Sequence, residues 1–103
     1  MSKLYLHATL KLRMGGYKRF CEVFAPQVPV LESYGWKLVG AWVTVVGRVH
    51  TVVDVWEIED GNAFYEGTAK WRARPDFAEF QKNFAEVVEE EVLTMVNKTP
   101  YSP

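Results

Sequence analysis

Residues 36–58, WKLVGAWVTVVGRVHTVVDVWEI, decide the fold, because they hold two runs of β-branched and aromatic residues separated by a short break. Such residues favour β-strands over helices. The runs at 36–46 and 49–58 are therefore predicted to be two strands, and Gly47-Arg48 between them is short enough for a hairpin turn. The centre of the fold is thus predicted to be an antiparallel sheet.

The segment before this hairpin predicts a strand followed by a helix. Residues 4–12, LYLHATLKL, alternate between aliphatic residues on one face and mixed residues on the other, which is typical of a strand. From Tyr17 to Leu31 the apolar residues recur at intervals of three and four, which indicates an amphipathic helix. Pro26 and Pro29 interrupt it because proline has no amide hydrogen to donate, so we expect a kinked helix or two stacked pieces.

The segment after the hairpin repeats the same order. Asp60-Gly61-Asn62 supplies capping side chains for a helix at about 63–73, and a further helical stretch begins at Phe77. Residues 92–96 are predicted to form a short last strand, and Glu89-Glu90-Glu91 a solvated helix end. The order matches the split βαβ arrangement of ferredoxin-like domains, an α+β fold in which helices cover one face of a four-stranded antiparallel sheet. We expect residues 1–103 to form one such domain.

Composition excludes several classes of function. The 103 residues carry a formal charge of −1, whereas a nucleic-acid-binding protein needs a basic surface. The apolar runs are too short for a membrane span or a signal peptide, and a single cysteine cannot form an internal disulfide. We therefore expect a cytoplasmic protein with neither a membrane nor a nucleic-acid partner.

Both faces of the central strands are apolar, which predicts a protein partner. A sheet with helices on one face and water on the other should have one polar face. In the first strand of the hairpin the two faces carry Val39, Ala41, Val43 and Val45 on one side and Leu38, Trp42 and Val46 on the other. The simplest way to cover the second face is to pack it against a second copy of the chain, so we predict a homodimer.

The sequence also resembles a known family. The stretches KLVG at 37–40 followed by Trp42, VVDVWE at 52–57 and RPDF at 74–77 are similar to those of NIPSNAP proteins, and the resemblance covers nearly the whole chain. It implies a dimeric α/β barrel, in which two ferredoxin-like sheets close around a central pocket. Members of the family often carry histidine where this chain has Asp54. The resemblance supplies no reaction.

The candidate ligand pocket is predicted on the mixed faces of the strands, because the face under the helices should be uniformly apolar. The residues selected in this way are Tyr5, His7 and Thr9 on the first strand and His50, Asp54 and Trp56 on the third. A two-residue hairpin turn would pair Ala41 with Asp54 and leave Trp42 in the helix-side core. A three-residue loop would turn Trp42 into the pocket.

Asp54 and His7 are the candidate catalytic residues. A carboxylate within a run of valines has a raised pKa if it is desolvated without a cation, which suits a general acid or base. His7 is the candidate for the complementary proton carrier. The alternatives are a structural Asp54 and a His7 that is merely hydrogen-bonded. The candidate ligand-binding residues are Tyr5, Thr9, His50, Trp56 and Tyr65.

No metal or cofactor is predicted. His50 and Asp54 lie four strand residues apart, roughly 13 Å, which is too far for two ligands of one ion. Trp56 resembles the tryptophan that packs on the macrocycle in haem-degrading relatives of this fold, but those relatives take their iron ligand from the following helix. Residues 63–73 contain no histidine. Cys21 lies on the apolar stripe of its helix and is predicted to be buried.

These observations favour two functions and leave a haem-handling enzyme open as a third. The first is a homodimer with an apolar pocket for a small hydrophobic or aromatic ligand, with cofactor-free proton-transfer or oxygenation chemistry as the candidate reaction. The alternative is a non-enzymatic interaction module, in which the barrel interior is filled by the protein's own rings.

Overall fold

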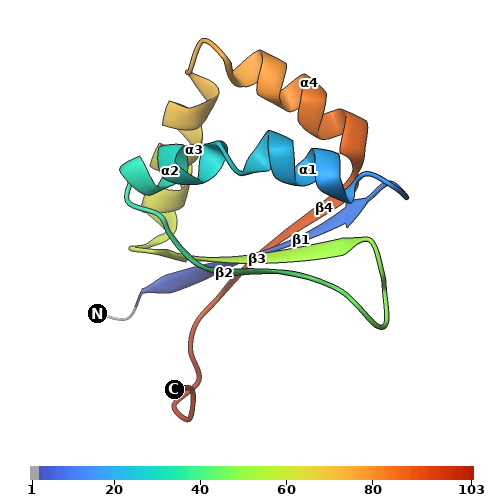
Figure 1. The fold of residues 1–103 in the computed structure, drawn as a ribbon. Helices are drawn as coiled ribbons and strands as arrows, with labels where there is room; N and C mark the ends of the chain where they lie inside the picture. The colour runs from blue at the N-terminus through green and yellow to red at the C-terminus, as the bar shows by residue number, and fades with distance from the viewer. Residues whose placement is uncertain (1–2) are drawn as a thin grey trace.

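The helices lie together on one face of the sheet in the computed structural model, which describes residues 3–103 (Figure 1). The described elements are β1 (Leu4–Leu12), α1 (Tyr17–Phe24), α2 (Gln27–Ser33), β2 (Lys37–Val43), β3 (Thr51–Ile58), α3 (Gly61–Arg72), α4 (Phe77–Val87) and β4 (Val88–Val96). The four strands run antiparallel in the order β2-β3-β1-β4. The predicted ferredoxin-like arrangement is confirmed.

The helices largely follow their predicted bounds. The helix interrupted by Pro26 forms two pieces, α1 and α2, as one of the two expectations had it. Asp60 caps α3, because its side-chain oxygen accepts a hydrogen bond from the Ala63 N–H at 2.8 Å. Within residues 3–103, no helix combines the length and the apolar character needed to cross a membrane.

The last strand begins earlier than predicted. β4 starts at Val88, directly after α4, and pairs with β1 over most of its length. Glu90 and Glu91 stand opposite Lys11 and Leu10 in that pairing. The prediction of a solvated helix end at 89–91 is therefore wrong, because sheet pairing overrides the helix-favouring character of glutamate.

The strand pairing reverses the predicted faces of β3. Leu6 pairs with Trp56 and Ala8 with Asp54, whereas His7 pairs with Val55. Asp54 and Trp56 therefore lie on the face under the helices, together with the buried leucines of β1. The prediction that they share a face with Tyr5, His7 and Thr9 is wrong. The mixed face of β3 is the other one, because it carries Thr51 and Glu57 at its ends.

An irregularity in β2 determines where Trp42 lies. Leu38 pairs with Trp56 and Gly40 pairs with Val55, so Val39 is an extra residue and forms a β-bulge. Ala41 then pairs with Asp54, which is the register of the two-residue alternative. The loop itself is longer, spanning residues 44–50. Trp42 pairs with Val53, on the face opposite to Asp54, so it lies on the open face and is 56% exposed. The expectation that this register leaves Trp42 in the helix-side core is wrong, because Asp54 itself faces the helices.

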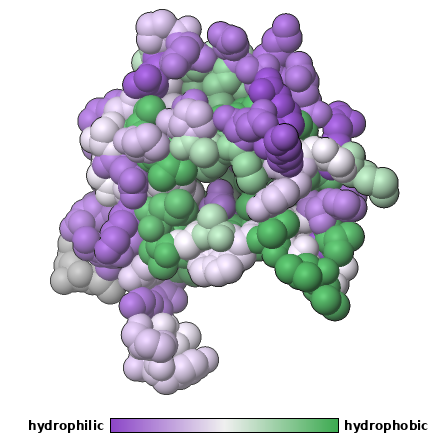
Figure 2. All heavy atoms as spheres, viewed as in Figure 1, coloured by the Kyte–Doolittle hydropathy of each residue, from purple (hydrophilic) through white to green (hydrophobic). Residues whose placement is uncertain are grey.

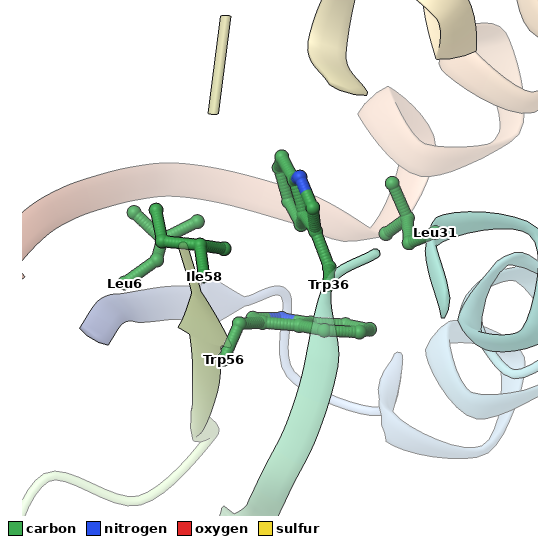
Figure 3. Close-up of a cluster of buried hydrophobic side chains, with 5 residues drawn as sticks. All are labelled: Leu6, Leu31, Trp36, Trp56 and Ile58. Atoms are coloured by element: carbon green, nitrogen blue, oxygen red, sulfur yellow. The ribbon is translucent and has the colours of Figure 1, made fainter. Parts of the chain in front are cut away.

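The core between helices and sheet consists of two separate clusters. One contains Leu6, Leu31, Trp36, Trp56 and Ile58, with the Trp36 ring standing edge-on to Trp56 at a centroid distance of 5.9 Å (Figure 3). The other contains Leu10, Leu12, Phe20, Val52 and Val87. The clusters lie at opposite ends of β3, because one contains Val52 and the other contains Trp56 and Ile58. Asp54 lies between these residues in the strand.

Gly67 in α3 allows Trp36 to approach the helix, and its replacement is expected to destabilise the fold. A Cβ at Gly67 would collide with the Trp36 indole, so Gly67→Ala should lower the free energy of unfolding by about 1–3 kcal/mol. Gly61→Ala is the matched control, because a Cβ there meets no atom within 4 Å. It should be neutral or stabilising by up to about 1 kcal/mol. Urea denaturation measures both, and equal effects would contradict this packing.

Candidate functional site

Asp54 is the one charged side chain that is buried among the described residues, with only 3% of its surface exposed. It lies in the middle of β3, and its neighbours on the same face of the adjacent strands are Ala8 of β1 and Ala41 of β2. Alanine side chains on both sides leave space above the sheet at this level. The carboxylate therefore projects into a hollow rather than into packed side chains.

Two cavities between the sheet and the helices meet at Asp54. The first, here called the aromatic cavity, has a volume of about 180 Å³ and lies under α3 and α4. The second, the α1 cavity, has a volume of about 260 Å³ and lies between α1 and β2. Asp54 and Phe24 are the residues that line both. Figure 2 shows an opening between the helical layer and the sheet, bordered in part by hydrophobic residues.

Eight of the eighteen residues that line the aromatic cavity carry aromatic rings. They come from both helical pairs and the sheet and comprise Phe24, Trp36, Trp56, Phe64, Trp71, Phe77, Phe80 and Phe84. The indole N–H of Trp36 donates to the Ala63 carbonyl at 3.2 Å, and that of Trp71 donates to Gln27 Oε1 at 2.9 Å. Because both donors are already engaged, these two rings offer the cavity apolar surface alone.

The Asp54 carboxylate faces these cavities without a partner among residues 3–103. No hydrogen bond or ion pair from the described chain reaches it, and its oxygens border the open space. Desolvation raises the pKa of Asp54 to about 6, and no cation of the described chain offsets that shift. At pH 7 the Asp54 carboxylate is thus mainly ionised, and it is about half protonated one pH unit lower, near pH 6.

Two further charged groups lie at the edge of the aromatic cavity. Arg72 reaches it from α3 and Glu91 from β4, and both side chains remain more than one-third exposed. Desolvation also raises the pKa of Glu91. In residues 3–103, no three His, Cys, Asp or Glu side chains converge as a metal site would require.

Of the predicted site residues, only Asp54 and Trp56 line a cavity together. Tyr5, His7 and Thr9 lie on the open face of the sheet, opposite to Asp54, because they occupy the other parity of β1. His50 lies in the β2–β3 loop with φ +63°, where its carbonyl accepts a hydrogen bond from the Leu12 N–H. Tyr65 is 71% exposed and packs against Phe64. His7 is therefore not placed to exchange a proton with Asp54.

Several lining residues were not predicted as site residues. The phenylalanines of α1 and α4 have helical spacing, which indicated core packing, and they do form core as well as cavity wall. Cys21 was predicted to be buried, but it is exposed and lines the α1 cavity. The sequence signal that could have identified the cavity is the pairing of one carboxylate with two flanking alanines, which depends on strand register.

A protein-family model and several solved structures are similar to this chain. The NIPSNAP family model matches residues 5–103. A NIPSNAP family protein of unknown function from Agrobacterium tumefaciens is similar in structure, with a TM-score of 0.88, 19% identity and coverage of 99% of this chain and 93% of the other. A NIPSNAP-like domain protein from Burkholderia xenovorans has a TM-score of 0.84 and 25% identity, and the match covers 99% of this chain and 90% of that one.

A more distant structure is also similar in fold. A protein of unknown function from Bacteroides thetaiotaomicron, described as a possible oxidoreductase, has a TM-score of 0.68 and 9% identity, and the match covers 94% of this chain and 98% of that one. Among curated proteins, none is significantly similar to the chain in sequence.

Proposed function

Since the chain belongs to the NIPSNAP family, we propose that it binds a small hydrophobic or aromatic molecule in the aromatic cavity and that Asp54 exchanges a proton with this ligand. The size of the cavity supports this proposal, because an apolar cavity of about 150 Å³ is enough to hold benzene. Trp56 forms part of the wall against which the ligand packs.

The observation that carries the proposal is the unpaired Asp54 carboxylate. A buried carboxylate that serves only structure is normally satisfied by hydrogen bonds or a cation. Asp54 has neither among the described residues, and it faces two cavities. Burying a charge in this way destabilises a fold, and such costs concentrate at functional sites. A ligand in the aromatic cavity would be the missing partner.

The candidate reactions are those that one carboxylate and an apolar cavity can support. With a pKa of about 6, Asp54 suits the role of a base that removes a proton from an activated C–H or O–H group near neutral pH. Cofactor-free oxygenation of an electron-rich aromatic compound would begin with the same step. The description of the Bacteroides neighbour as a possible oxidoreductase is compatible with that second route.

Filling the aromatic cavity is expected to abolish ligand binding. Ala8 lines this cavity beside Asp54, so the added volume of Ala8→Leu would occupy it. We expect the affinity for benzyl alcohol to fall at least tenfold, as measured by NMR shifts of the Trp36 and Trp71 indole N–H signals. Thr9→Val is the matched control on the open face of the same strand. Unchanged affinity in Ala8→Leu would contradict binding at this site.

We further propose that the open face of the sheet is covered by a second copy of the chain. This face carries no helix, and Trp42, Val92 and Val96 are each more than 40% exposed on it. The β2–β3 loop adds Val45 and Val46, which are 82% and 89% exposed. Exposed apolar side chains gathered on one face in this way are typical of a protein interface. Packing of one sheet against another would bury it in a symmetric dimer.

A further inference from the structure

We propose that the ligand of the aromatic cavity is a hydrophobic amine, whose protonated nitrogen binds the Asp54 carboxylate while its apolar body packs among the rings. The inference rests on the proposed function and names the chemical class of the ligand.

The polar groups of the aromatic cavity favour a ligand that carries a hydrogen-bond donor. An ionised carboxylate accepts hydrogen bonds and donates none. Two donors of the cavity wall, the Trp36 and Trp71 indole N–H groups, bind Ala63 and Gln27 instead. The other side chains of the wall that can donate are Thr68, Gln81 and Arg72, and none of them forms a hydrogen bond to Asp54. A ligand that reaches Asp54 must therefore bring its own donor, and a carboxylate or phosphate ligand would be repelled there.

The environment of Asp54 favours a cationic donor over a neutral one. Pairing two charges inside a protein usually gains little, because both must lose their water. Here the folded protein has already desolvated the carboxylate, so only the ammonium group of the ligand loses water on binding. Charge-assisted hydrogen bonds are roughly twice as strong as neutral ones. The surrounding aromatic rings add a favourable interaction with a cation.

The other charged or titratable groups on the walls of the two cavities do not bind Asp54 in place of such a ligand. On the cavity walls, α3 contributes Arg72 and β4 contributes Glu91, while α1 contributes the Tyr17 hydroxyl and the Cys21 thiol on the other side. The lining residues of β1, β2, α2 and α4 carry no charge. A hydrogen bond with Cys21 raises the pKa of the Tyr17 hydroxyl above its usual range. Asp54 and Glu91 are thus the carboxylates whose ionisation sets the charge of the aromatic cavity in mild acid.

The test compares three probes of similar shape: benzylamine, benzyl alcohol and phenylacetate. At pH 7.5 benzylamine should bind at least tenfold more tightly than benzyl alcohol, and phenylacetate should not bind measurably. Between pH 5 and 7.5 the affinity for benzylamine should rise about tenfold, because only the ionised form of Asp54 is competent. The affinity for benzyl alcohol should change little. Shifts of the Trp36 and Trp71 indole N–H signals measure binding in each case.

Substitutions of single carboxylates show which one causes the preference for benzylamine and its pH dependence. Asp54→Asn should remove both the preference for benzylamine and its pH dependence while leaving benzyl alcohol binding in place. Glu59→Gln, an exposed carboxylate just after β3, should retain both. The inference is overturned if benzyl alcohol binds as tightly as benzylamine, or if Glu91→Gln rather than Asp54→Asn removes the pH dependence. If none of the three probes binds, the proposed function falls together with the inference.

Discussion

Replacing Asp54 with asparagine is expected to stabilise the protein at pH 7.5, although it removes the central residue of the proposed site. The folded protein raises the pKa of Asp54 from 3.8 to about 6. Above pH 6 the folded state therefore holds a desolvated charge that the unfolded state can hydrate. The difference corresponds to roughly 2–3 kcal/mol, which Asp54→Asn should recover. Urea denaturation at pH 7.5 measures the change.

The pH dependence of the free energy of unfolding tests the sign of this effect a second time. Because the folded pKa of Asp54 is raised, its contribution favours folding below pH 4 and is lost as the pH rises through 6. The wild-type protein should lose stability relative to Asp54→Asn over this window, and the two should be similar near pH 4. Glu91 adds a slope of the same sign to both proteins, so it cancels in the comparison. Equal free energies of unfolding at pH 7.5 would contradict this, because they would mean that the Asp54 carboxylate has hydrogen-bond or ionic partners in solution.

Replacing Trp42 with glutamate is expected to dissociate the proposed dimer. Trp42 lies over Gly40 on the open face, where a Cβ at position 40 would collide with its ring, so the indole presents a broad apolar surface. Buried tryptophans are frequent hot spots of interfaces, and truncating one costs about 2 kcal/mol or more. A charge at this position in both copies adds repulsion. Sedimentation should show a dimer for the wild type and a monomer for Trp42→Glu at micromolar concentration.

The matched control for this variant is Tyr65→Glu. Tyr65 is a similarly exposed aromatic residue, but it lies on α3, on the helical side of the molecule. Its replacement should leave the wild-type oligomeric state unchanged. A wild-type protein that sediments as a monomer would refute the dimer, as would a Trp42→Glu protein that remains dimeric.

The architecture could be predicted from the sequence because it depends on local signals. The alternation in residues 4–12, the break at Pro26 and the Asp60 cap each act within a few residues, and each has its predicted effect. Pro29 does not interrupt a helix as predicted, because it lies in the first turn of α2, where no amide hydrogen is needed. The exception is the start of β4, since the glutamates at 89–91 enter a strand only because β1 pairs with them.

The site could be predicted only in part, because it depends on strand register and parity. Asp54 was identified correctly as unusual, since a carboxylate within a run of valines stands out in any arrangement. Its face was predicted wrongly, because a polar residue was assigned to the side away from the helices. The helical layer leaves a cavity over Ala8 and Ala41, so the helix-facing side accommodates a charge there. Neither the cavity nor the bulge at Val39 has a local signature in the sequence.

The bulge at Val39 also bears on how copies of this protein avoid uncontrolled association. β2 is an edge strand, and a regular edge exposes a row of unpaired amide and carbonyl groups that can template another chain. The extra residue at Val39 interrupts that row, while the other edge strand, β4, carries three consecutive glutamates. Growth of the sheet into fibrils through either edge is thereby disfavoured.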